Sequence, residues 1–577
     1  MTPTLEMDLP LCVNVILDCG GYLRMRVATF LLAGKRVAFA SATTEGPVFA
    51  MRALFVLVSL FWFATALGAQ AGKDFARDNL RADEFFGRGT ISDFRITLDD
   101  AAREAIRKEP RKYVKATLLE GTKVLGVVGI KLKGAVGSFQ EFDARPAITV
   151  NVDKFTVGQS CHGLLKFHLN NSVQDDSLLS EMFGSEVFRA AGIPAARVTH
   201  ASLHLDDRDL GVYVLKEGFD ARFLERNFGT SNGSLYDGGF CQEIDADLEK
   251  DIGDKATSSD RAALVEACRI KETSKRGKEL PTVLDIEAFI TFSCLERMLA
   301  HWDGYLQSRN NYRLYFDASG HGQFLPHGMD QLLGDAEATV LATPESLVGA
   351  AVLKLSNWRA RYRARLVELL PVLRSAEIRK RIEAAIARLR KIVGRRDQDG
   401  GQGFGARAAD FIQRLDQRCR NLERELKAPE PKPLELAPME SASIDDWLAA
   451  RTTENARLAA TPVDGIKALK VSSQGKGACT GSWRANVLLK PGHYRLEAKV
   501  KLKDVVGSGD VAGVLLRRSG DATSPQRISG TQTWQKIEHE FVIADTLQEV
   551  VLVAELKSSS GQVWFRRDAF RLVRLPD

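Results

Sequence analysis

Short apolar runs alternate with turn residues over residues 113–152, which is typical of antiparallel strands. Apolar residues then recur at helical spacing over 176–190, on one face of a predicted helix. Two more strand patterns follow, at 198–205 and 210–216. This order of sheet, helix and sheet predicts an α+β fold and excludes a simple helical bundle or solenoid.

A second helical pattern over 285–300 leads into a stretch of the chain that is rich in polar residues. Two short strands are predicted next, at 309–315 and 322–326, and the polar segment 327–334 follows the second of them. Since these pieces are neighbours along the chain, we expect the polar residues after the helix and after the second strand to lie close together.

The remaining sequence divides the chain into further parts. Residues 358–427 show a strongly basic helical pattern, predicting a helical extension whose Arg and Lys side chains are solvated. Residues 428–440 begin with alternating prolines and predict a stiff linker. Residues 441–577 show strand patterns with strict alternation and predict a β-sandwich. The segment 72–357 is then the larger, α+β domain.

The N-terminal region contains an apolar run at 53–67 that follows a basic residue and precedes the small residues 69–71. This is the layout of a secretory signal peptide over 51–71, although a buried helix of the mature protein is the alternative. The run is shorter than the roughly 20 residues that span a bilayer, so we expect no permanent membrane anchor. Because a signal peptide is N-terminal, Met51 is the predicted start, and residues 1–50 are interpreted as a mis-annotated upstream extension. The mature protein would be secreted, periplasmic or attached to the cell envelope.

Composition restricts the partners and the covalent cross-links. The 577 residues include 80 basic and 74 acidic side chains, and these are spread along the chain, so no nucleic-acid partner is expected. The length predicts two or three domains. The cysteines after residue 71 lack the spacing of a zinc site, whereas export makes a Cys241–Cys268 disulfide a candidate.

The polar residues of the central segment are those that phosphoryl transfer needs. Asp303 would orient an incoming hydroxyl group, and Asp330 with Asn310 or Asn311 would hold magnesium through oxygen ligands. Taken singly, either aspartate is more often a cap or a turn residue than a catalytic group. Their occurrence together with two asparagines predicts a metal–nucleotide site.

Two glycines three residues apart, Gly134 and Gly137, lie within the first predicted sheet. Glycines let a backbone turn approach a ligand closely, and free amides in such a turn bind phosphate oxygens. An ordinary hairpin turn explains the same residues equally well.

Three ordered motifs in the central segment are His-Trp-Asp-Gly-Tyr (301–305), Arg-Asn-Asn-Tyr-Arg-Leu-Tyr (309–315) and Pro-His-Gly-Met-Asp-Gln-Leu-Leu-Gly (326–334). With Lys-Gly-Ala-Val-Gly-Ser-Phe (133–139), they resemble the CotH kinase family of spore coat proteins, over about residues 115–333. The resemblance implies a reduced protein-kinase-like fold, binding of ATP with Mg²⁺ or Mn²⁺, and phosphorylation of exported proteins, which include surface proteins or the chain itself.

By position, the resemblance makes Asp303 the catalytic aspartate and Asp330 the metal-binding aspartate, with Gly134 and Gly137 in the glycine loop. The two asparagines of the second motif lie seven and eight residues after Asp303, whereas ordinary protein kinases place this asparagine five residues after the aspartate. This departure leaves open which asparagine binds the metal.

The resemblance also implies a set of charged residues around the nucleotide. Glu181 would be a helix glutamate that pairs with a nucleotide-contacting base, and Glu217 belongs to the same predicted site. Many relatives have a lysine where this chain has Arg145, so Arg145 would contact phosphate, with Lys154 and Lys166 as alternatives.

Two other functions fit parts of the sequence. A scaffold with a catalytically degenerate kinase fold, binding cell-surface or glycan partners, would explain arginine in place of the lysine. A metal-dependent hydrolase would use a cluster of histidines and carboxylates, namely His301, Asp303, His321, His327 and Asp330.

The C-terminal segment resembles carbohydrate-binding modules of the jelly-roll kind, through residues 489–498, 533–534 and 563–568. Sugar rings stack on exposed aromatic side chains, so Trp534 or Trp564 would contact a glycan partner. The alternative is that both tryptophans are core residues.

Overall fold

The computed structural model describes four short strands near the N-terminus and most of the chain from residue 75 onward. The described residues are 15–17, 23–25, 30–32, 35–37 and 75–576, without 343, 397, 428–432, 452, 454, 476–478, 508–512, 520–526 and 544–546. The chain forms two compact units, residues 1–80 and 81–577, and the second unit carries the candidate site.

The first unit contains two short antiparallel pairs. These are β1 (Val15–Leu17) with β2 (Leu23–Met25), and β3 (Phe30–Leu32) with β4 (Lys35–Val37). The predicted signal peptide, residues 51–71, lies outside the described residues, so export stays a prediction. Within the described part of the chain, no helix is long and apolar enough to cross a membrane.

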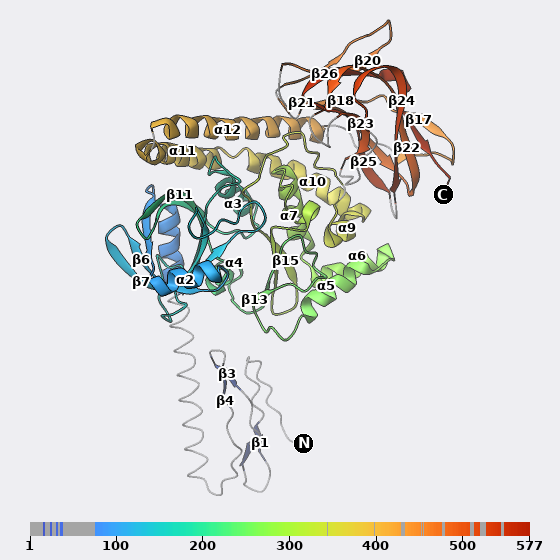
Figure 1. Cartoon of the computed structure of the whole chain (residues 1–577). Helices are drawn as coiled ribbons and strands as arrows, with labels where there is room; N and C mark the ends of the chain where they lie inside the picture. Colours follow the sequence, from blue (N-terminus) through green and yellow to red (C-terminus); the bar gives the residue numbers. More distant parts are fainter. Residues whose placement is uncertain are drawn as a thin grey trace. The chain divides into compact units, whose positions relative to one another are not determined.

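Seven strands of the second unit form a closed barrel in the order β10-β11-β9-β8-β7-β6-β5 (Figure 1). Neighbouring strands are antiparallel, except that β5 and β10 pair in parallel and close the barrel. The strands are β5 (Ser92–Thr97), β6 (Val114–Glu120), β7 (Lys123–Lys133), β8 (Ala147–Asn151), β9 (Lys166–Asn170), β10 (Val198–Leu205) and β11 (Arg208–Glu217). The helix α2 (Asp100–Lys108) packs against β6.

The barrel strands alternate between an inner face, which forms the barrel core, and an outer face. Phe167 and Leu215 belong to the barrel core. The residues that follow them, His168 and Lys216, are direct neighbours in the register of β9 and β11, and Thr149 of β8 pairs with His168. Because successive residues of a strand point to opposite faces, these three side chains form a polar row on the outer face. The row is buried, since the helical half of the domain covers it.

The other half of the domain surrounds a four-stranded sheet in the order β13-β12-β14-β15. α3 (Ser180–Ala190) and α7 (Ile286–Met298) lie in the predicted helical segments, and β14 (Tyr312–Phe316) and β15 (Gly322–Pro326) form the central hairpin. The mixed composition of helices and strands confirms the α+β prediction. The other elements are α4 (Ala221–Phe228), β12 (Ser234–Asp237), β13 (Lys250–Ile252), α5 (Ser259–Arg269), α6 (Thr273–Val283), α8 (Tyr305–Ser308) and α9 (Leu347–Leu353).

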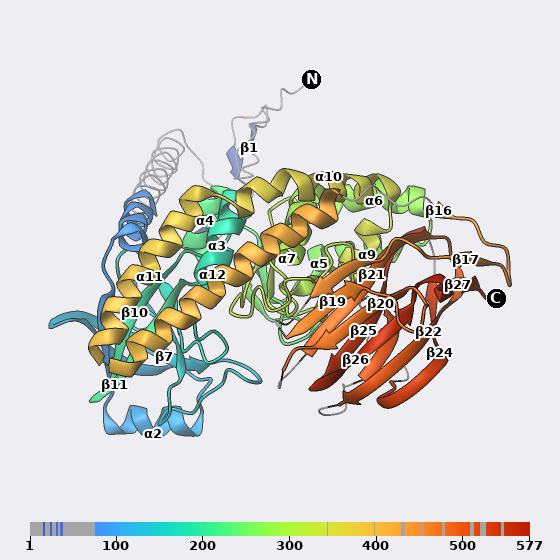
Figure 2. The ribbon, with the colours of Figure 1, turned by 90° about the horizontal axis from the view of Figure 1, so that it is seen from above.

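Three long helices complete this domain: α10 (Ser356–Leu373), α11 (Ala376–Arg396) and α12 (Gln398–Lys427). Figures 1 and 2 show α11 and α12 lying side by side. Buried side chains of all three helices belong to the same hydrophobic core as α3 and α7. The apolar faces of the predicted helical extension therefore pack into the domain core.

The C-terminal part is a β-sandwich with its own hydrophobic core, to which both sheets contribute. This confirms the sandwich prediction, although β16 already pairs with β21 before the predicted start at residue 441. One sheet contains β16 (Pro433–Leu434), β18 (Leu448–Arg451), β21 (Cys479–Leu489), β23 (Gly513–Arg518) and β25 (Gln548–Ser558). The other contains β17 (Ser441–Ser443), β19 (Ala456–Ala460), β20 (Ala468–Ser473), β22 (Gly492–Val506), β24 (Gly530–Ile543), β26 (Ser560–Arg566) and β27 (Arg571–Arg574).

The candidate disulfide is not formed. Cys241 is exposed, whereas Cys268 is buried in α5, and both are free thiols. Burial raises the pKa of the Cys268 thiol to about 12, so this side chain behaves as a small apolar core residue.

Candidate active site

A buried ion pair connects the barrel to the helical half of the domain. Lys216 lies on the outer face of β11, and Glu181 lies in the first turn of α3. The Lys216 Nζ is 2.5 Å from the Glu181 Oε1, and the side chains are 1% and 2% exposed. Among the described residues, the Glu181 Oε2 is buried without a hydrogen-bond partner. A buried carboxylate oxygen of this kind is suited to a further polar or cationic partner.

A second lysine, Lys133, lies at the end of β7 close to the same group. Its Nζ donates to the Asn170 Oδ1 at 2.7 Å. Burial lowers the pKa of Lys133 to about 8, and the positive charge of Lys216 lowers it further. Two lysines held this close together create a positive site that an anionic ligand would stabilise.

The lysine of the ion pair also contacts a histidine of the central segment. The Lys216 Nζ donates to the His327 Nδ1 at 3.1 Å. Burial, together with the positive charge of Lys216, lowers the pKa of His327 well below its ordinary value. His327 is therefore neutral and can accept this hydrogen bond.

The carboxylate of Asp303 is held by two asparagine amides. Its Oδ1 accepts from the Asn310 Nδ2 at 3.0 Å, and its Oδ2 accepts from the Asn311 Nδ2 at 2.7 Å. Both asparagines follow the short helix α8, and Asn311 has a left-handed φ of 51°. The chain thus bends back directly after α8, and the two amides meet the carboxylate.

The two asparagines differ in the use of their side-chain oxygens. The Asn310 Oδ1 accepts from the backbone N–H of Cys241 at 3.3 Å, so this amide is engaged at both ends. The Asn311 Oδ1 instead lies against Gly328, where an added Cβ would be 2.0 Å from the oxygen. Asn311 therefore presents its oxygen toward the turn that leads to Asp330, two residues after this glycine.

Asp330 is half-buried beside the other charged groups of the site. Burial raises the pKa of Asp330 to about 6, and the negative charge of Glu181 raises it further, while Lys133 opposes this effect. Asp330 and Glu181 are thus two carboxylates that lie near each other and are shielded from water, an arrangement that a bound cation would stabilise.

Continuous contacts join Asp303 to Glu181. The Asn311 amide donates to Asp303, and the backbone oxygen of Asn311 accepts from the backbone N–H of His327 at 3.0 Å. His327 then contacts Lys216, which pairs with Glu181. The two aspartate-bearing segments, the helix glutamate and the strand lysine thus form one site.

The glycine loop begins directly after Lys133. Gly134 and Gly137 have φ values of 108° and 82°, and a Cβ at Gly134 would be 2.9 Å from the backbone nitrogen of Phe139. A side chain at either position would strain the turn. The Asn171 Nδ2 donates to the backbone oxygens of Ser138 and Arg145, which fixes the loop against the end of β9.

A buried glutamate supports the segment that follows Asp303. The Glu296 oxygens accept from the backbone N–H groups of Tyr305 at 2.8 Å and Leu306 at 2.9 Å, which begin α8. Burial raises the pKa of Glu296 to about 7, although these two hydrogen bonds favour the charged form. No sequence signal marked this residue, because it lies within an apolar helical pattern.

Comparison with known proteins identifies the family. The family model described as CotH kinase protein matches residues 130–421, just over half of the chain. The chain belongs to the CotH kinase protein family. Invasin CotH7 of Rhizopus delemar is 22% identical over 196 residues, which cover 31% of this chain and 33% of that relative. The match thus spans one third of the length of the curated relative.

Solved carbohydrate-binding modules also share similarity with part of this CotH-family chain. The CBM22-1 xylan-binding domain of Paenibacillus barcinonensis Xyn10C is 15% identical, with a TM-score of 0.17, covering 26% of this chain and 100% of its own. The module CBM6cm-2 from Cellvibrio mixtus lichenase 5A, in complex with cellotriose, is 13% identical, with a TM-score of 0.16, covering 24% and 100%. These scores are too low to assign a ligand to this chain.

The bases that the sequence suggested as partners of Glu181 lie elsewhere in this CotH domain. The Arg145 guanidinium donates to backbone oxygens of β11 and lies over the ring of Tyr213, with 4.9 Å from Cζ to the ring centroid. Lys154 lies over an aromatic ring near β6, and the Lys166 Nζ donates to the backbone oxygen of Phe219 at 3.3 Å. In the structure, the basic residue that pairs with Glu181 is Lys216.

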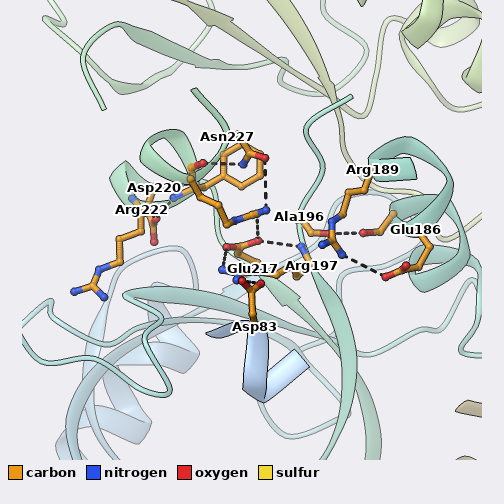
Figure 3. A network of polar contacts seen from close by, with 12 residues as sticks. Asp83, Glu186, Arg189, Ala196, Arg197, Glu217, Asp220, Arg222 and Asn227 are labelled. Atoms are coloured by element: carbon orange, nitrogen blue, oxygen red, sulfur yellow. Dashed lines mark hydrogen bonds and ion pairs between the residues drawn. The ribbon is translucent and has the colours of Figure 1, made fainter. Parts of the chain in front are cut away.

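Glu217, the other acidic residue predicted near the nucleotide, belongs to a separate ion network (Figure 3). Its carboxylate is 2.5 Å from the Arg197 Nη2 and 2.6 Å from the Arg226 Nη2, and Asp83 also binds Arg197. Glu217 follows Lys216 on the strand, so its side chain points to the opposite face. Its role in the structure is to hold the end of the barrel together.

Of the three histidines of the alternative metal site, His301 lies beside His327, whereas His321 lies apart from them. The His321 Nε2 contacts the backbone oxygen of Pro281 at 2.7 Å, while His327 contacts Lys216. Over the described part of the chain, no group of three or more His, Cys, Asp and Glu side chains is placed to hold a metal ion. The metal-dependent hydrolase therefore gains no support from the structure.

The tryptophans suggested for glycan stacking are not both at the surface of the sandwich. Trp564 on β26 is 8% exposed, and the Lys470 Nζ lies 5.2 Å from its ring centroid. Its ring is therefore covered, although the sandwich core contains its strand neighbours Val563 and Phe565 rather than Trp564 itself. Trp534 on β24 is half-buried.

Proposed function

We propose that this CotH-family protein is a kinase with a reduced protein-kinase-like fold, transferring the γ-phosphate of Mg-ATP or Mn-ATP to hydroxyl groups of exported proteins. The observation that carries the proposal is the continuous set of contacts from Asp303 through Asn311, His327 and Lys216 to Glu181. Phosphoryl transfer depends mainly on positioning and charge, and this set joins the side chains that such a reaction uses.

In this proposal, Lys216 and Lys133 contact the phosphate groups. Glu181 holds Lys216 in place through the buried pair, so the lysine is oriented before the nucleotide binds. The lowered pKa of Lys133 fits this role, because a phosphate anion would compensate the repulsion between the two ammonium groups. The glycine loop that follows Lys133 would supply backbone amides to the same phosphates.

Asp330 and Asn311 would hold the magnesium ion. The raised pKa of Asp330 and the unpartnered Glu181 Oε2 show an excess of buried acceptor groups, which fits a cation site. Magnesium, when bound, supplies charge neutralisation for the phosphates. Asn310 is the less suited asparagine, because its oxygen is already engaged by Cys241.

Asp303 would orient the acceptor hydroxyl group and receive its proton. The two asparagine amides hold the carboxylate in one orientation. Each carboxylate oxygen still has acceptor capacity, since an ionised carboxylate can accept about four hydrogen bonds. The residue is half-buried, so an acceptor side chain can reach it.

The scaffold alternative loses its main argument. It rested on arginine at position 145 in place of a phosphate-contacting lysine. We assign that role to Lys216 and Lys133, which lie beside Glu181 and Asn170. The predicted signal peptide supports exported substrates, because an exported enzyme meets them after secretion.

The test compares the two aspartates in the mature protein. Asp330→Asn should weaken metal-dependent ATP binding and remove transfer, whereas Asp303→Asn should keep ATP binding and lower transfer roughly a hundredfold or more. Binding is measured by calorimetry with Mg²⁺ or Mn²⁺, and transfer with labelled ATP on exported proteins or the chain itself. Arg145→Ala is the control and should change neither. If wild-type protein bound no ATP with either metal, the proposal would be wrong.

A further inference from the structure

Arg418 is a buried cation of α12 that lies far along the sequence from the two aspartates. Its side chain is fully buried, with 0% of its surface exposed. Among the described residues, the guanidinium donates to four backbone oxygens and to no carboxylate. These four oxygens come from two segments, and each segment is connected directly to one of the site aspartates.

Two of the oxygens belong to the C-terminal end of α7. The Arg418 Nε donates to the backbone oxygen of Met298 at 2.9 Å, and its Nη2 donates to that of Arg297 at 2.6 Å. A helix end leaves its last carbonyl groups without helical partners and carries partial negative charge, so a buried cation is favourable there. Asp303 follows five residues after Met298, so the direction in which the chain leaves α7 determines where this carboxylate lies.

The other two oxygens belong to the segment that follows Asp330. The Arg418 Nη1 donates to the backbone oxygens of Ala336 at 3.1 Å and Ala338 at 2.5 Å. The two segments also touch directly, because the backbone N–H of Leu333 donates to the backbone oxygen of Leu299 at 2.9 Å. Arg418 therefore binds both aspartate-bearing segments with one rigid planar group.

Neighbouring residues on the same face of α12 bind the same segment. The Arg414 Nη1 donates to the backbone oxygen of Leu332 at 3.2 Å, and the Asn421 Nδ2 donates to that of Ala336 at 2.8 Å. Positions 414, 418 and 421 are spaced by four and three residues, which places them on one helix face. This face of α12 thus follows the segment 332–338 along its length.

We propose that Arg418 is a positioning residue of this site, which fixes Asp330 relative to Asp303 by binding the segments that carry them. The inference rests on the proposed function, since it takes the two aspartates as parts of one site. According to this proposal, the geometry of the site depends on α12, because hydrogen bonds from α12 hold the segment that follows Asp330. Arg418 touches neither the nucleotide nor the acceptor and acts only through these backbone groups.

The first test is hydrogen exchange of the backbone amides in the mature protein. Arg418→Met should speed exchange about tenfold or more at residues 299–303 and 332–340, while the barrel stays protected. Arg418→Lys keeps the positive charge and should therefore fold more readily than Arg418→Met. Because a single amine replaces the planar guanidinium, exchange at the same residues should speed up, but by less than in Arg418→Met. The control is Leu422→Ala, a buried apolar residue of the same helix that cannot form hydrogen bonds. Equal exchange in the Arg418 variants and the control would overturn the inference.

The second test measures the Mg²⁺ concentration that gives half-maximal ATP binding, at a temperature where every variant is folded. Arg418→Met should need about tenfold more Mg²⁺, because Asp330 is displaced, and Arg418→Lys should show a smaller increase, whereas Leu422→Ala should need the wild-type concentration. An unchanged Mg²⁺ requirement in both Arg418 variants would also overturn the inference. If wild-type protein bound no ATP, the proposed function would fail, and the exchange experiment would still decide whether Arg418 holds the two segments.

Discussion

The Nζ of Lys216 on β11 lies 2.5 Å from the Oε1 of Glu181 on α3, and both side chains are almost completely buried. A buried pair of this kind contributes little net stability when intact, but removing one partner leaves an uncompensated charge. The pair therefore makes the position of α3 and the orientation of Lys216 depend on each other.

The first prediction is that either partner of this pair, replaced alone, destabilises the protein. Lys216→Met and Glu181→Gln should each lower the free energy of unfolding by about 3–5 kcal/mol, measured by urea denaturation. The double variant should be more stable than the sum of the two changes predicts. Arg361→Met, which breaks an exposed contact with Glu287, is the matched control and should have little effect. Additive effects in the double variant would show that the pair is not coupled.

The second prediction concerns the pH dependence that Glu296 gives to stability. Its pKa rises from an ordinary 4.5 to about 7 in the folded protein, so the folded state binds one more proton than the unfolded state between these values. Stability from this group is fully present below pH 4.5 and is lost as the pH rises through 7, by about 3–4 kcal/mol in all. Glu296→Gln resembles the protonated form and should remove this part of the pH dependence. The exposed Glu287→Gln on the same helix should retain it.

The check is the free energy of unfolding at pH 5.5 and at pH 8. A wild-type protein and a Glu296→Gln variant with the same change between these two conditions would contradict the prediction. If Glu296→Gln also lost transfer activity at either pH, this would indicate that the hydrogen bonds from the first residues of α8 to Glu296 help to position Asp303.

The third prediction separates the two asparagines. Asn311→Ala should remove a metal ligand and weaken Mg-ATP binding about tenfold or more, because its oxygen lies toward the turn before Asp330. Asn310→Ala should lower transfer more than binding, since its amide holds Asp303 while its oxygen is taken by Cys241. Calorimetry with Mg²⁺ and a transfer assay distinguish the two. If Asn310→Ala weakened Mg-ATP binding more than Asn311→Ala did, Asn310 would be the metal ligand and the prediction would be wrong.

The fourth prediction is a pH dependence of nucleotide binding that comes from Lys133. With a pKa of about 8, its ammonium group loses charge as the pH rises from 7 to 9, so ATP binding should weaken about tenfold over this range. Lys133→Arg stays charged and should bind ATP with little change over the same range. Lys154→Arg, at a lysine outside the site, should keep the wild-type dependence. Binding by wild-type protein that did not vary between pH 7 and 9 would show that Lys133 does not contact phosphate.

Local patterns in the sequence were sufficient for one half of the candidate site. Asp303, the two asparagines and Asp330 lie within a helix end, a hairpin and the loop after it, and such neighbours in the chain remain neighbours in space. Strict alternation of apolar and polar residues likewise predicted the sandwich, because each of its sheets has one face on a core.

The partner of Glu181 was not predictable in the same way. Lys216 lies 35 positions further along the chain, within an apolar strand pattern that resembles any core strand. Only the closure of the barrel determines which face of β11 meets α3. The same reason explains the two residues that looked suitable in the sequence but lie elsewhere. Arg145 donates to backbone oxygens of β11, and Glu217 belongs to a separate network of arginines.

The sequence by itself determined the family, the α+β class and the aspartates of the candidate site, because these depend on residue type and short spacing. The tertiary structure decided that Lys216 pairs with Glu181, that Lys133 bonds to Asn170, and that Arg418 joins the segments around the two aspartates. It also decided that the apolar faces of α10, α11 and α12 pack into the same core as α3 and α7. The physical reason is that burial and pairing of a charge depend on which surfaces meet when the chain folds, and residues far apart in sequence supply those surfaces.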